Sequence, residues 1–445
     1  MYVKKIFALF LLVAVLLSAC GTATPVATEA PVVAPTVAPT DVPAPTAAPT
    51  MEPVELRFTY YADGVEADVM KPLLDKFMAE NPGITVVLDV VPYKTIDEQL
   101  PVQLESGTGP DLARITNFGA YKAKLLDLRP VLADSAYYEA NFPAPILEAL
   151  NYGGFPDTLT VTGPYVNKTL FDQAGETLLG EGATWQQWTE VTEKVAKATG
   201  VQYAIAIDRT GHRFAGPAMS MGATLINAEN GFTVDTPGFR AYAEIVKGWH
   251  DKGLTPKEVW LGAEPVNSCI AAFKSGQLVM CMSGSWQING VAKDVADAFD
   301  WVVVPNPTGE GGSTGIAGGS AVVVFASSKH PQEAAKLVEF LIKAENYSEF
   351  SAGTLSLPAN KEVAAKGVSF KTENPFVLAA LSAYTTEVPK LKEQAVALNV
   401  HPYAFAYYRN SANRIAQYLS GELKLDEMLV NLQQDIDKAI EEAKK

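Results

Sequence analysis

Cysteine and histidine, which many catalytic and metal sites need, are scarce in this chain. Its 445 residues include only three cysteines and four histidines. The histidines (His212, His250, His330 and His401) are scattered and lack the spacing of metal ligands. The motifs H-E-x-x-H and G-x-x-x-x-G-K-[ST] are absent, and the glycine-rich stretch 309–319 has no lysine to cradle a phosphate. We therefore expect a protein that is not an enzyme and has no metal or cofactor.

Basic residues and long hydrophobic runs are also scarce. The net charge is −15, and it becomes −17 if Lys4 and Lys5 are removed with a signal segment. A chain this acidic is a poor candidate for binding nucleic acid or an anionic membrane surface. No apolar run after the first 20 residues reaches about 18 residues, so no further membrane span is expected. The 48% hydrophobic and 19% charged residues are typical of a globular domain.

The first cysteine ends a segment that reads as a secretion signal. Lys4 and Lys5 precede the apolar run 6–17, which is too short to span a bilayer comfortably. The sequence Leu-Ser-Ala-Cys at 17–20 resembles the bacterial lipobox, in which the cysteine becomes the lipid-carrying N-terminus. We expect residues 1–19 to be the signal peptide and Cys20 to anchor the protein at the outer face of the cell membrane. The alternative is an ordinary signal peptide with a chance cysteine.

Residues 20–53 are expected to form a linker rather than a domain. The segment from Gly21 to Pro53 contains eight prolines, no lysine or arginine, and no aromatic residue. It cannot bury a core and should stay extended or disordered. The remaining part, about 390 residues, is large enough for roughly two domains.

Cys269 and Cys281 are the two remaining cysteines. The first lies in an expected helix that ends at Gly276, and the second lies in the strand that returns from it. Seven helical residues rise about 10 Å and five strand residues about 16 Å, so the two sulfurs could lie at a similar height. Outside the cytoplasm they could form a disulfide, and two buried free thiols are the alternative.

Hydrophobic periodicity alternates between strands and helices along the folded region. Strands are expected at 54–60, 84–93, 277–284, 301–307 and 320–327. Helices are expected at 70–78, 185–198, 239–249, 331–343 and near the C-terminus, where Met428, Leu429, Leu432, Ile436 and Ile440 share one face. This order predicts an α/β fold with largely parallel sheets.

Several short stretches then follow one another in an informative order. They are NPGITV (81–86), ESGTGPDL (105–112), LLDL (125–128), YVNKTLFDQAG (165–175), TW (184–185), FKSGQLVMCMSGSW (273–286), PNPTG (305–309), GG (318–319), EAAKLVEFL (333–341) and LSGELKLDEML (419–429). Over roughly residues 54–440 this set resembles the extracellular solute-binding proteins of sugar-importing ABC transporters, the maltose-binding-protein-like family. A lipid-anchored receptor beside its permease would also explain the position of Cys20.

The resemblance implies a periplasmic-binding-protein-like fold, in which two α/β lobes joined by crossover hinge strands hold a ligand between them. By position, crossings should fall near 154–160, 304–308 and 353–360. Lobe one would then comprise 54–156 and 308–355, and lobe two 157–307 and 356–445. The resemblance also implies ABC permease subunits as partners, and we expect a monomer.

Aromatic side chains are the first candidates for contacts with a sugar, because sugar faces carry apolar C–H groups. Trp286 follows a strand and a small turn, where the family often presents ligand contacts. Tyr60 and Tyr61 end the first strand, and ligands gather at the carboxyl ends of strands in open α/β sheets. Tyr403 lies in an aromatic-rich stretch. For each of these residues, packing in the core is the alternative.

Polar candidates complete the expected site. Each has a structural alternative, such as capping a turn for the aspartate or pairing with surface acids for the arginines. The glycines are candidates because a missing side chain lets backbone N–H groups approach a ligand. These candidates are Asp111, Asn117, Arg209, Arg213, Gly318 and Gly319.

Two departures from the family pattern leave the ligand open. Val166 separates Tyr165 from Asn167-Lys168, where the family commonly has tyrosine directly before Asn-Lys, and residues 156–163 lack aromatic contacts. We read Asn167 and Lys168 as the structural opening of a helix. The best hypothesis is a receptor for a mono- or oligosaccharide. The alternatives are a receptor for a polyamine, phosphodiester or peptide, in which an anionic ligand would favour the arginines at 209 and 213, and a surface adhesin.

Overall fold

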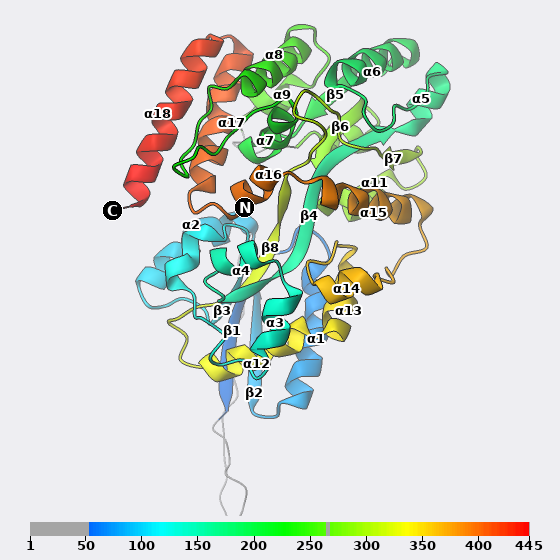
Figure 1. Cartoon of the computed structure of the whole chain (residues 1–445). Coiled ribbons are helices and arrows are strands. Elements are labelled where there is room, and N and C mark those ends of the chain that lie inside the picture. Colours follow the sequence, from blue (N-terminus) through cyan, green and yellow to red (C-terminus); the bar gives the residue numbers. More distant parts are fainter. Residues whose placement is uncertain (1–52, 264–267, 445) are drawn as a thin grey trace, which may run out of the picture. The chain divides into compact units, whose positions relative to one another are not determined.

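A computed structural model of the chain describes residues 53–263 and 268–444 (Figure 1). The chain divides into two compact units, 1–50 and 51–445, and only the second is described below. The expected signal peptide, Cys20 and nearly all of the expected linker lie outside the described residues. Among the residues that are described, no helix combines the length and apolar character needed to cross a membrane.

One long strand, β4 (Gly154–Asn167), organises the folded unit. Its first part pairs with β8 (Ala317–Val324), and its second part pairs with β6 (Leu278–Gly284) and β7 (Trp301–Val303). The resulting strand order is β2-β1-β3-β8-β4-β6-β5, with β7 added on β4. Two groups of helices pack around the two ends of this arrangement, and we call these ends lobe one and lobe two (Figure 1).

Lobe one contains the N-terminal strands and two separate helical segments. Its core is formed by apolar residues from β1, α1, β8, α12 and α13. Its elements are β1 (Val54–Tyr60), α1 (Glu66–Glu80), β2 (Ile84–Val90), α2 (Tyr93–Glu105), β3 (Leu112–Ile115), η1 (Gly119–Lys124), α3 (Ser135–Asn141), α4 (Ala144–Ala149), β8, α12 (Pro331–Ile342), α13 (Ala344–Thr354) and α14 (Lys361–Lys366).

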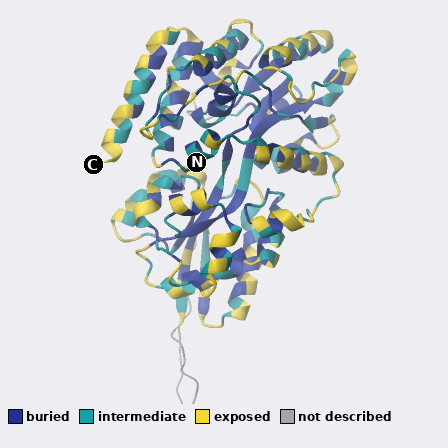
Figure 2. Cartoon of the chain, in the orientation of Figure 1, coloured by how far each residue is buried: buried dark blue, intermediate teal, exposed yellow. Residues whose placement is uncertain are grey.

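Lobe two contains the middle of the chain and its C-terminal helices around a larger core. Besides the second part of β4, β6 and β7, it contains α5 (Lys168–Ala174), α6 (Trp185–Thr199), β5 (Tyr203–Ile207), α7 (Gly211–Ser220), α8 (Pro237–Asp251), α9 (Lys257–Leu261), α10 (Ile270–Lys274), η2 (Ser285–Gln287), α11 (Ile288–Val295), α15 (Pro375–Glu387), η3 (Val388–Lys390), α16 (Glu393–Val400), α17 (Ala404–Ser420) and α18 (Leu425–Ala443). In both lobes the buried residues follow the strands and the inner faces of the helices (Figure 2).

The predicted α/β fold with crossover strands is confirmed, but the largely parallel sheet is wrong. β1 pairs in parallel with β2 and β3, and β5 pairs in parallel with β6. β8 is antiparallel to β3, and β4 is antiparallel to β6, β7 and β8. The sheet is mixed because both β4 and β8 run between the lobes in opposite directions.

The strand β4 covers the first predicted crossing, and the second crossing lies later in the chain than 304–308. Residues 308–316 still pack on lobe two, since the N–H of Thr308 donates to Ala183 O and that of Gly311 to Ser220 O. The second crossing is therefore β8 itself. Residues 356–366 contact both lobes, since Leu357 lies in the lobe-two core and pairs with Leu159 of β4, whereas Val363 lies in the lobe-one core. The predicted third crossing, near 353–360, therefore stays a prediction.

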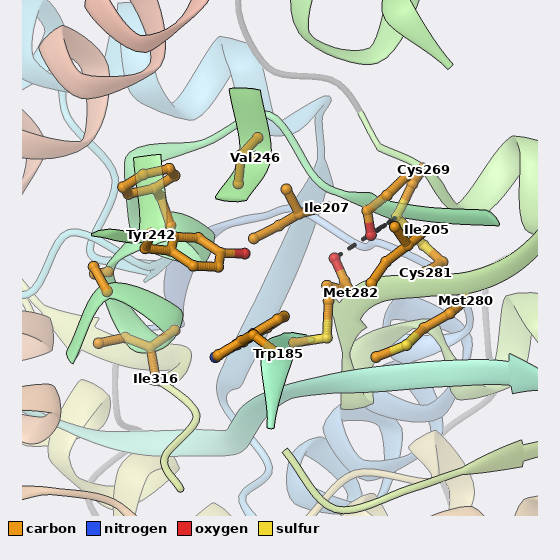
Figure 3. Close-up of a cluster of buried hydrophobic side chains, with 14 of the residues drawn as sticks. Trp185, Ile205, Ile207, Tyr242, Val246, Cys269, Met280, Cys281, Met282 and Ile316 are labelled. Carbon is orange, nitrogen blue, oxygen red and sulfur yellow. Dashed lines mark hydrogen bonds between the residues drawn. A yellow bond between two sulfur atoms is a disulfide. The ribbon is translucent and has the colours of Figure 1, made fainter. Parts of the chain in front are cut away.

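Cys269 and Cys281 form a disulfide, which decides between the two alternatives left open above. Cys269 immediately precedes α10, which packs on β6, and Cys281 lies in β6. Figure 3 shows the bridge inside the lobe-two core, beside Ile205 and Met280. The structural interpretation of Asn167 is also confirmed, because its Oδ1 accepts the Leu170 N–H at the start of α5.

His250 makes stability depend on pH. It is 2% exposed at the end of α8, and neither ring nitrogen has a hydrogen-bond partner among the described residues. Burial lowers its pKa to about 4, with Lys257 and Lys247 adding to the effect. The folded protein therefore holds this ring neutral, whereas the unfolded chain takes up a proton below about pH 6.5.

We expect His250 to remove about 2 kcal/mol from the free energy of unfolding between pH 7.5 and pH 5. The loss follows because only the unfolded state is protonated in this window. Urea unfolding of wild type and His250→Leu across the window checks this: the variant should lose less stability toward pH 5. His330→Leu, at a half-exposed histidine, is the control. Equal pH slopes for wild type and His250→Leu would contradict the prediction.

Candidate functional site

A buried ion pair supports the lobe-one side of the junction between the lobes. Arg114 lies in β3 and is 2% exposed, and its Nε donates to Asp157 Oδ2 of β4 at 2.9 Å. Its Nη1 donates to Tyr61 O at 2.8 Å, and Ser320 Oγ of β8 donates to the other Asp157 oxygen at 2.6 Å. These contacts join β1, β3, β4 and β8 at the point where the two crossing strands leave the lobe.

The same guanidinium packs against Tyr60 and Tyr61. We call the lobe-one side of the junction, with these residues, the lobe-one wall. The central carbon of the guanidinium lies 5.1 Å from the Tyr60 ring centroid and 4.5 Å from that of Tyr61. Tyr60 is fully buried and Tyr61 is 2% exposed. The expectation that one of them offers its ring to a ligand is therefore not supported, because Arg114 and the surrounding core cover both.

Tyr93 provides the exposed aromatic ring instead. It is the first residue of α2 and remains 38% exposed, while its ring stands edge-on to that of Tyr61 at 5.1 Å. Its hydroxyl is 2.8 Å from Thr116 Oγ1, just after β3. Desolvation raises the pKa of Tyr93 to about 12.

Asp63 is the carboxylate of this wall without a protein partner. It lies in the loop between β1 and α1, is exposed, and forms no hydrogen bond or ion pair within the described chain. Desolvation raises its pKa, and the nearby charge of Arg114 opposes the shift. Glu66, by contrast, has partners in the protein. One carboxylate oxygen accepts the Gly64 N–H, and the other lies 4.0 Å from Arg114 Nη2.

The lobe-two side of the junction, which we call the lobe-two wall, contains an arginine stacked on a tryptophan. Thr210 caps α7 by accepting the Arg213 N–H, which places Arg213 in the first turn of the helix. The Arg213 guanidinium lies 3.9 Å from the Trp286 ring, and its Nε is 4.0 Å from Asp208 Oδ2. Trp286 is half-exposed and folds back over Gly284, where a Cβ would come within 1.8 Å of the ring.

His212 connects this wall to β8, the second crossing strand, through a hydrogen bond. Burial and the charge of Arg213 hold its pKa well below the ordinary value, so the ring is neutral. Nδ1 accepts from Arg213 Nη1, and Nε2 donates to Ala317 O of β8 at 2.9 Å. The Tyr408 ring of α17 stands edge-on to the His212 ring at 5.1 Å.

The two walls lie near each other at the junction. Desolvation dominates the pKa shifts of Asp63 in lobe one and Arg213 in lobe two, but the charge of Arg213 lowers the pKa of Asp63, and Asp63 raises the pKa of Arg213. Arg409 of α17 forms an ion pair with Asp97 of α2, four residues after Tyr93. An acceptor, an aromatic ring and a cation–aromatic pair are thus brought together from segments that are distant in the sequence.

The remaining predicted residues lie elsewhere or have structural roles. Asp111 precedes β3, at the opposite end from Thr116, and accepts from the Arg57 N–H and Ser328 Oγ, so it is a structural residue. Asn117 is half-buried just after β3 and stays a candidate. Arg209 donates to Gly262 O and lines a pocket of 480 Å³ between α9 and α17, away from Arg213. Tyr403 directly precedes α17, and its ring contacts His401 and Lys444.

Gly318 and Gly319 are explained by close packing. A Cβ on Gly319, whose φ is +130°, would lie 2.1 Å from Thr158 O, where β4 carries an irregularity. A Cβ on Gly318 would lie 2.8 Å from Thr160 Oγ1 and 3.5 Å from the His212 ring. Both glycines therefore let β8 approach its neighbours, and their contact with a ligand stays a prediction.

Sequence reasoning missed Asp63, Tyr93, Arg114, Asp157 and Tyr408. A signal existed for Arg114, because a lone charge interrupts the apolar strand Leu-Ala-Arg-Ile at 112–115. Tyr93 was assigned to the end of a strand, whereas Pro92 ends the extended segment and α2 begins at Tyr93. Asp63 lies in a loop without periodicity, so only the folded structure reveals it.

Two features that suggest chemistry have structural explanations. Asp208 lies close to Cys269 and Cys281, but the two sulfurs are bonded to each other and supply no thiolate for a metal. Residues 311–315 have the spacing G-x-S-x-G, which marks a nucleophile between a strand and a helix in some hydrolases. Here Ser313 Oγ donates to Asn306 O, and a strand, β8, follows the segment.

Breaking the Arg114–Asp157 pair should destabilise the protein strongly. We expect Arg114→Met to lower the free energy of unfolding by about 3–5 kcal/mol, because it leaves the buried Asp157 carboxylate uncompensated. The double variant Arg114→Met/Asp157→Leu should recover part of the loss. Arg57→Met, at an exposed arginine 4.0 Å from Asp89, should cost under about 1 kcal/mol. Urea unfolding measures all three, and a small loss for Arg114→Met would refute this account of the wall.

Comparisons with known proteins agree with this architecture. A binding protein of Brucella abortus is 27% identical over 327 residues, covering 70% of this chain and 76% of its own length. The multiple sugar-binding protein of Streptococcus mutans is 24% identical over 316 residues, covering 65% and 72%.

The two-lobe fold is shared with solved structures. The cyclic alpha-maltosyl-1,6-maltose binding protein of Arthrobacter globiformis superposes with a TM-score of 0.68 at 21% identity, covering 87% of this chain and 98% of its own. A maltose-bound protein from T. maritima gives 0.70 at 18% identity, covering 87% and 100%. Residues 73–377 match the family described as bacterial extracellular solute-binding protein. The chain belongs to this family of extracellular solute-binding proteins.

Proposed function

We propose that this protein captures a sugar, a mono- or oligosaccharide, between its two lobes and delivers it to an ABC permease. The observation that carries the proposal is the set of side chains at the junction: Asp63, unpaired within the described chain, and the exposed Tyr93 from lobe one, and Arg213 stacked on Trp286 from lobe two. Sugars present hydroxyls at their rims and C–H groups on their faces. A free carboxylate, an exposed ring and a positioned guanidinium match both kinds of surface.

The charges at the junction disfavour an anionic ligand. Arg209, one of the two arginines that would serve such a ligand, is directed to Gly262 O in another part of lobe two. Arg213 is already stacked on Trp286 and close to Asp208. Among the described residues around the junction, five carboxylates accompany three guanidiniums: Asp63, Glu66, Asp97, Asp157 and Asp208 beside Arg114, Arg213 and Arg409. A phosphodiester would meet net repulsion there.

The family relationship supports an extracytoplasmic role in transport rather than catalysis. In the mechanism we propose, lipid on Cys20 holds the protein at the outer face of the membrane and residues 20–53 act as a tether. The monomer binds ligand with both lobes, so the ligand favours the closed state and shifts the population toward it. The permease and its ATPase then perform the transport step.

A polyamine is the second candidate. The specific observation in its favour is Asp63, an exposed carboxylate without a partner in the described chain and with a raised pKa. An ammonium group would relieve the desolvation of this carboxylate, and Tyr93 offers a ring for the cation to contact. Arg213 weighs against it, because a polyamine would meet a like charge in lobe two.

A thermal-shift screen of the purified protein tests the proposal. Neutral mono- and oligosaccharides, amino sugars, uronic acids, polyamines and phosphodiesters form the panel. A ligand at a hundred times its Kd should stabilise the folded state by about 2.7 kcal/mol and raise Tm. We expect a neutral sugar to do so in wild type and in Tyr203→Ala, but not in Tyr93→Ala. Tyr203 begins β5, at the end away from Trp286. A response to polyamines alone would replace the sugar, and silence of the whole panel would oppose both.

Asp63→Asn should then weaken binding of that sugar about tenfold or more, because a hydrogen bond to a charged acceptor contributes about 1.5–3 kcal/mol. Isothermal titration calorimetry measures the change in Kd. The matched control is Asp68→Asn, an exposed acid in the first turn of α1. Equal affinities for wild type and Asp63→Asn would exclude Asp63 from the site.

A further inference from the structure

Asp208 occupies a buried position directly behind the lobe-two wall. It follows β5 and is 4% exposed. One carboxylate oxygen accepts from Ser268 Oγ at 2.7 Å and from the Cys269 N–H at 2.9 Å. The other accepts from Ser283 Oγ at 2.6 Å and lies 4.0 Å from Arg213 Nε. Neutral donors thus hold the carboxylate, and Arg213 provides the only cation within ion-pair distance among the described residues.

The disulfide joins the two segments that supply these donors. Cys269 lies next to Ser268, and Cys281 lies in β6 two residues before Ser283. Both cysteines are fully buried, and Figure 3 shows their bridge close to Met282. The disulfide therefore fixes the spacing between the two sides of the cradle that holds Asp208.

The same strand leads to the ligand-facing residues. β6 ends at Gly284, and Trp286 follows in η2, folded back over that glycine. Arg213 covers the Trp286 ring at 3.9 Å, while its Nε has no hydrogen-bond acceptor among the described residues. His212 Nδ1 accepts from Arg213 Nη1, and Asp208 is the carboxylate within ion-pair distance that can keep the guanidinium over the ring.

We propose that Asp208, held by the Cys269–Cys281 bridge, is the positioning residue for the Arg213–Trp286 pair. The bridge thereby sets the geometry of the ligand-facing wall and does more than stabilise the fold. The importance of that wall for sugar capture rests on the proposed function, whereas the positioning itself does not. Without the negative charge, Arg213 would lose its counter-ion and leave the ring, which would then become more accessible.

Trp286 offers a direct measurement. The other five tryptophans, at positions 185, 188, 249, 260 and 301, are at most 2% exposed, whereas Trp286 is half-exposed. Acrylamide quenching of tryptophan fluorescence in the purified protein therefore reports chiefly on Trp286, and Trp286→Phe supplies the background. Arg213→Ala, which uncovers the ring, sets the upper reference for quenching.

We expect Asp208→Asn and the double variant Cys269→Ala/Cys281→Ala each to raise the Stern–Volmer constant toward that of Arg213→Ala. Asp208→Asn combined with Arg213→Ala should add nothing further. Ile436→Ala, at a fully buried residue of α18 in the same lobe, controls for general destabilisation and should leave quenching unchanged. Tm of every variant is measured in parallel.

A fall in Tm without a change in quenching, for either Asp208→Asn or the cysteine variant, would overturn the proposal and leave the affected group a purely stabilising role. An equal rise in Ile436→Ala would overturn it as well. The readout requires no sugar. Altered quenching in a protein that responds to no member of the ligand panel would therefore reject the sugar proposal while retaining the positioning role.

Discussion

The whole arrangement depends on β4 being one continuous strand that serves two lobes. Its residues up to Val161 pair with β8, and those from Thr162 onward pair with β6. A strand in this position cannot be displaced without breaking the ladders of both lobes. It also carries Asp157, whose buried charge has to be neutralised within the fold. Arg114 of β3 does so, which fixes the register of the lobe-one wall relative to the crossing strands.

The carboxylates at the junction differ in how many hydrogen-bond partners the protein gives them. Asp157 and Asp208 are buried and accept several hydrogen bonds, so they act as scaffolding. Asp63 has no such partners in the described chain, although burial of its surroundings raises its pKa. Burying a charge without hydrogen-bond partners costs free energy. A ligand that donates hydrogen bonds to a partly desolvated carboxylate reduces this cost. This difference separates structural acids from the candidate binding acid.

The sequence was informative where a pattern is local. Alternation predicted β1, helical spacing predicted the inner face of α18, and the capping role of Asn167 was recognisable from its place before a helix. Resemblance to a family located the Trp286 segment, whereas Arg213 was a candidate because of its own side chain. Both walls, however, consist of residues brought together by pairings between distant strands.

Those distant pairings explain the errors. β4 contains two prolines and two glycines within its 14 residues, so no strand pattern revealed its length. Tyr60 and Tyr61 lie at the correct strand end, but Arg114, which covers them, comes more than fifty residues later. Arg209 and Arg213 look equivalent in sequence. Only the start of α7 after Thr210 places one toward Trp286 and the other toward Gly262.

The direct contacts between the lobes also constrain how closure can be controlled. Arg409 and Asp97 pair across the junction, but their side chains are 62% and 26% exposed. Such a pair contributes at most about 1 kcal/mol. Moving a two-state equilibrium from mostly open to mostly closed requires about 5.5 kcal/mol of differential binding. The ion pair can therefore adjust the resting balance but cannot supply the switch. In the proposed mechanism, a ligand that contacts both walls at once, through Asp63 and Tyr93 on one side and Arg213 and Trp286 on the other, supplies it.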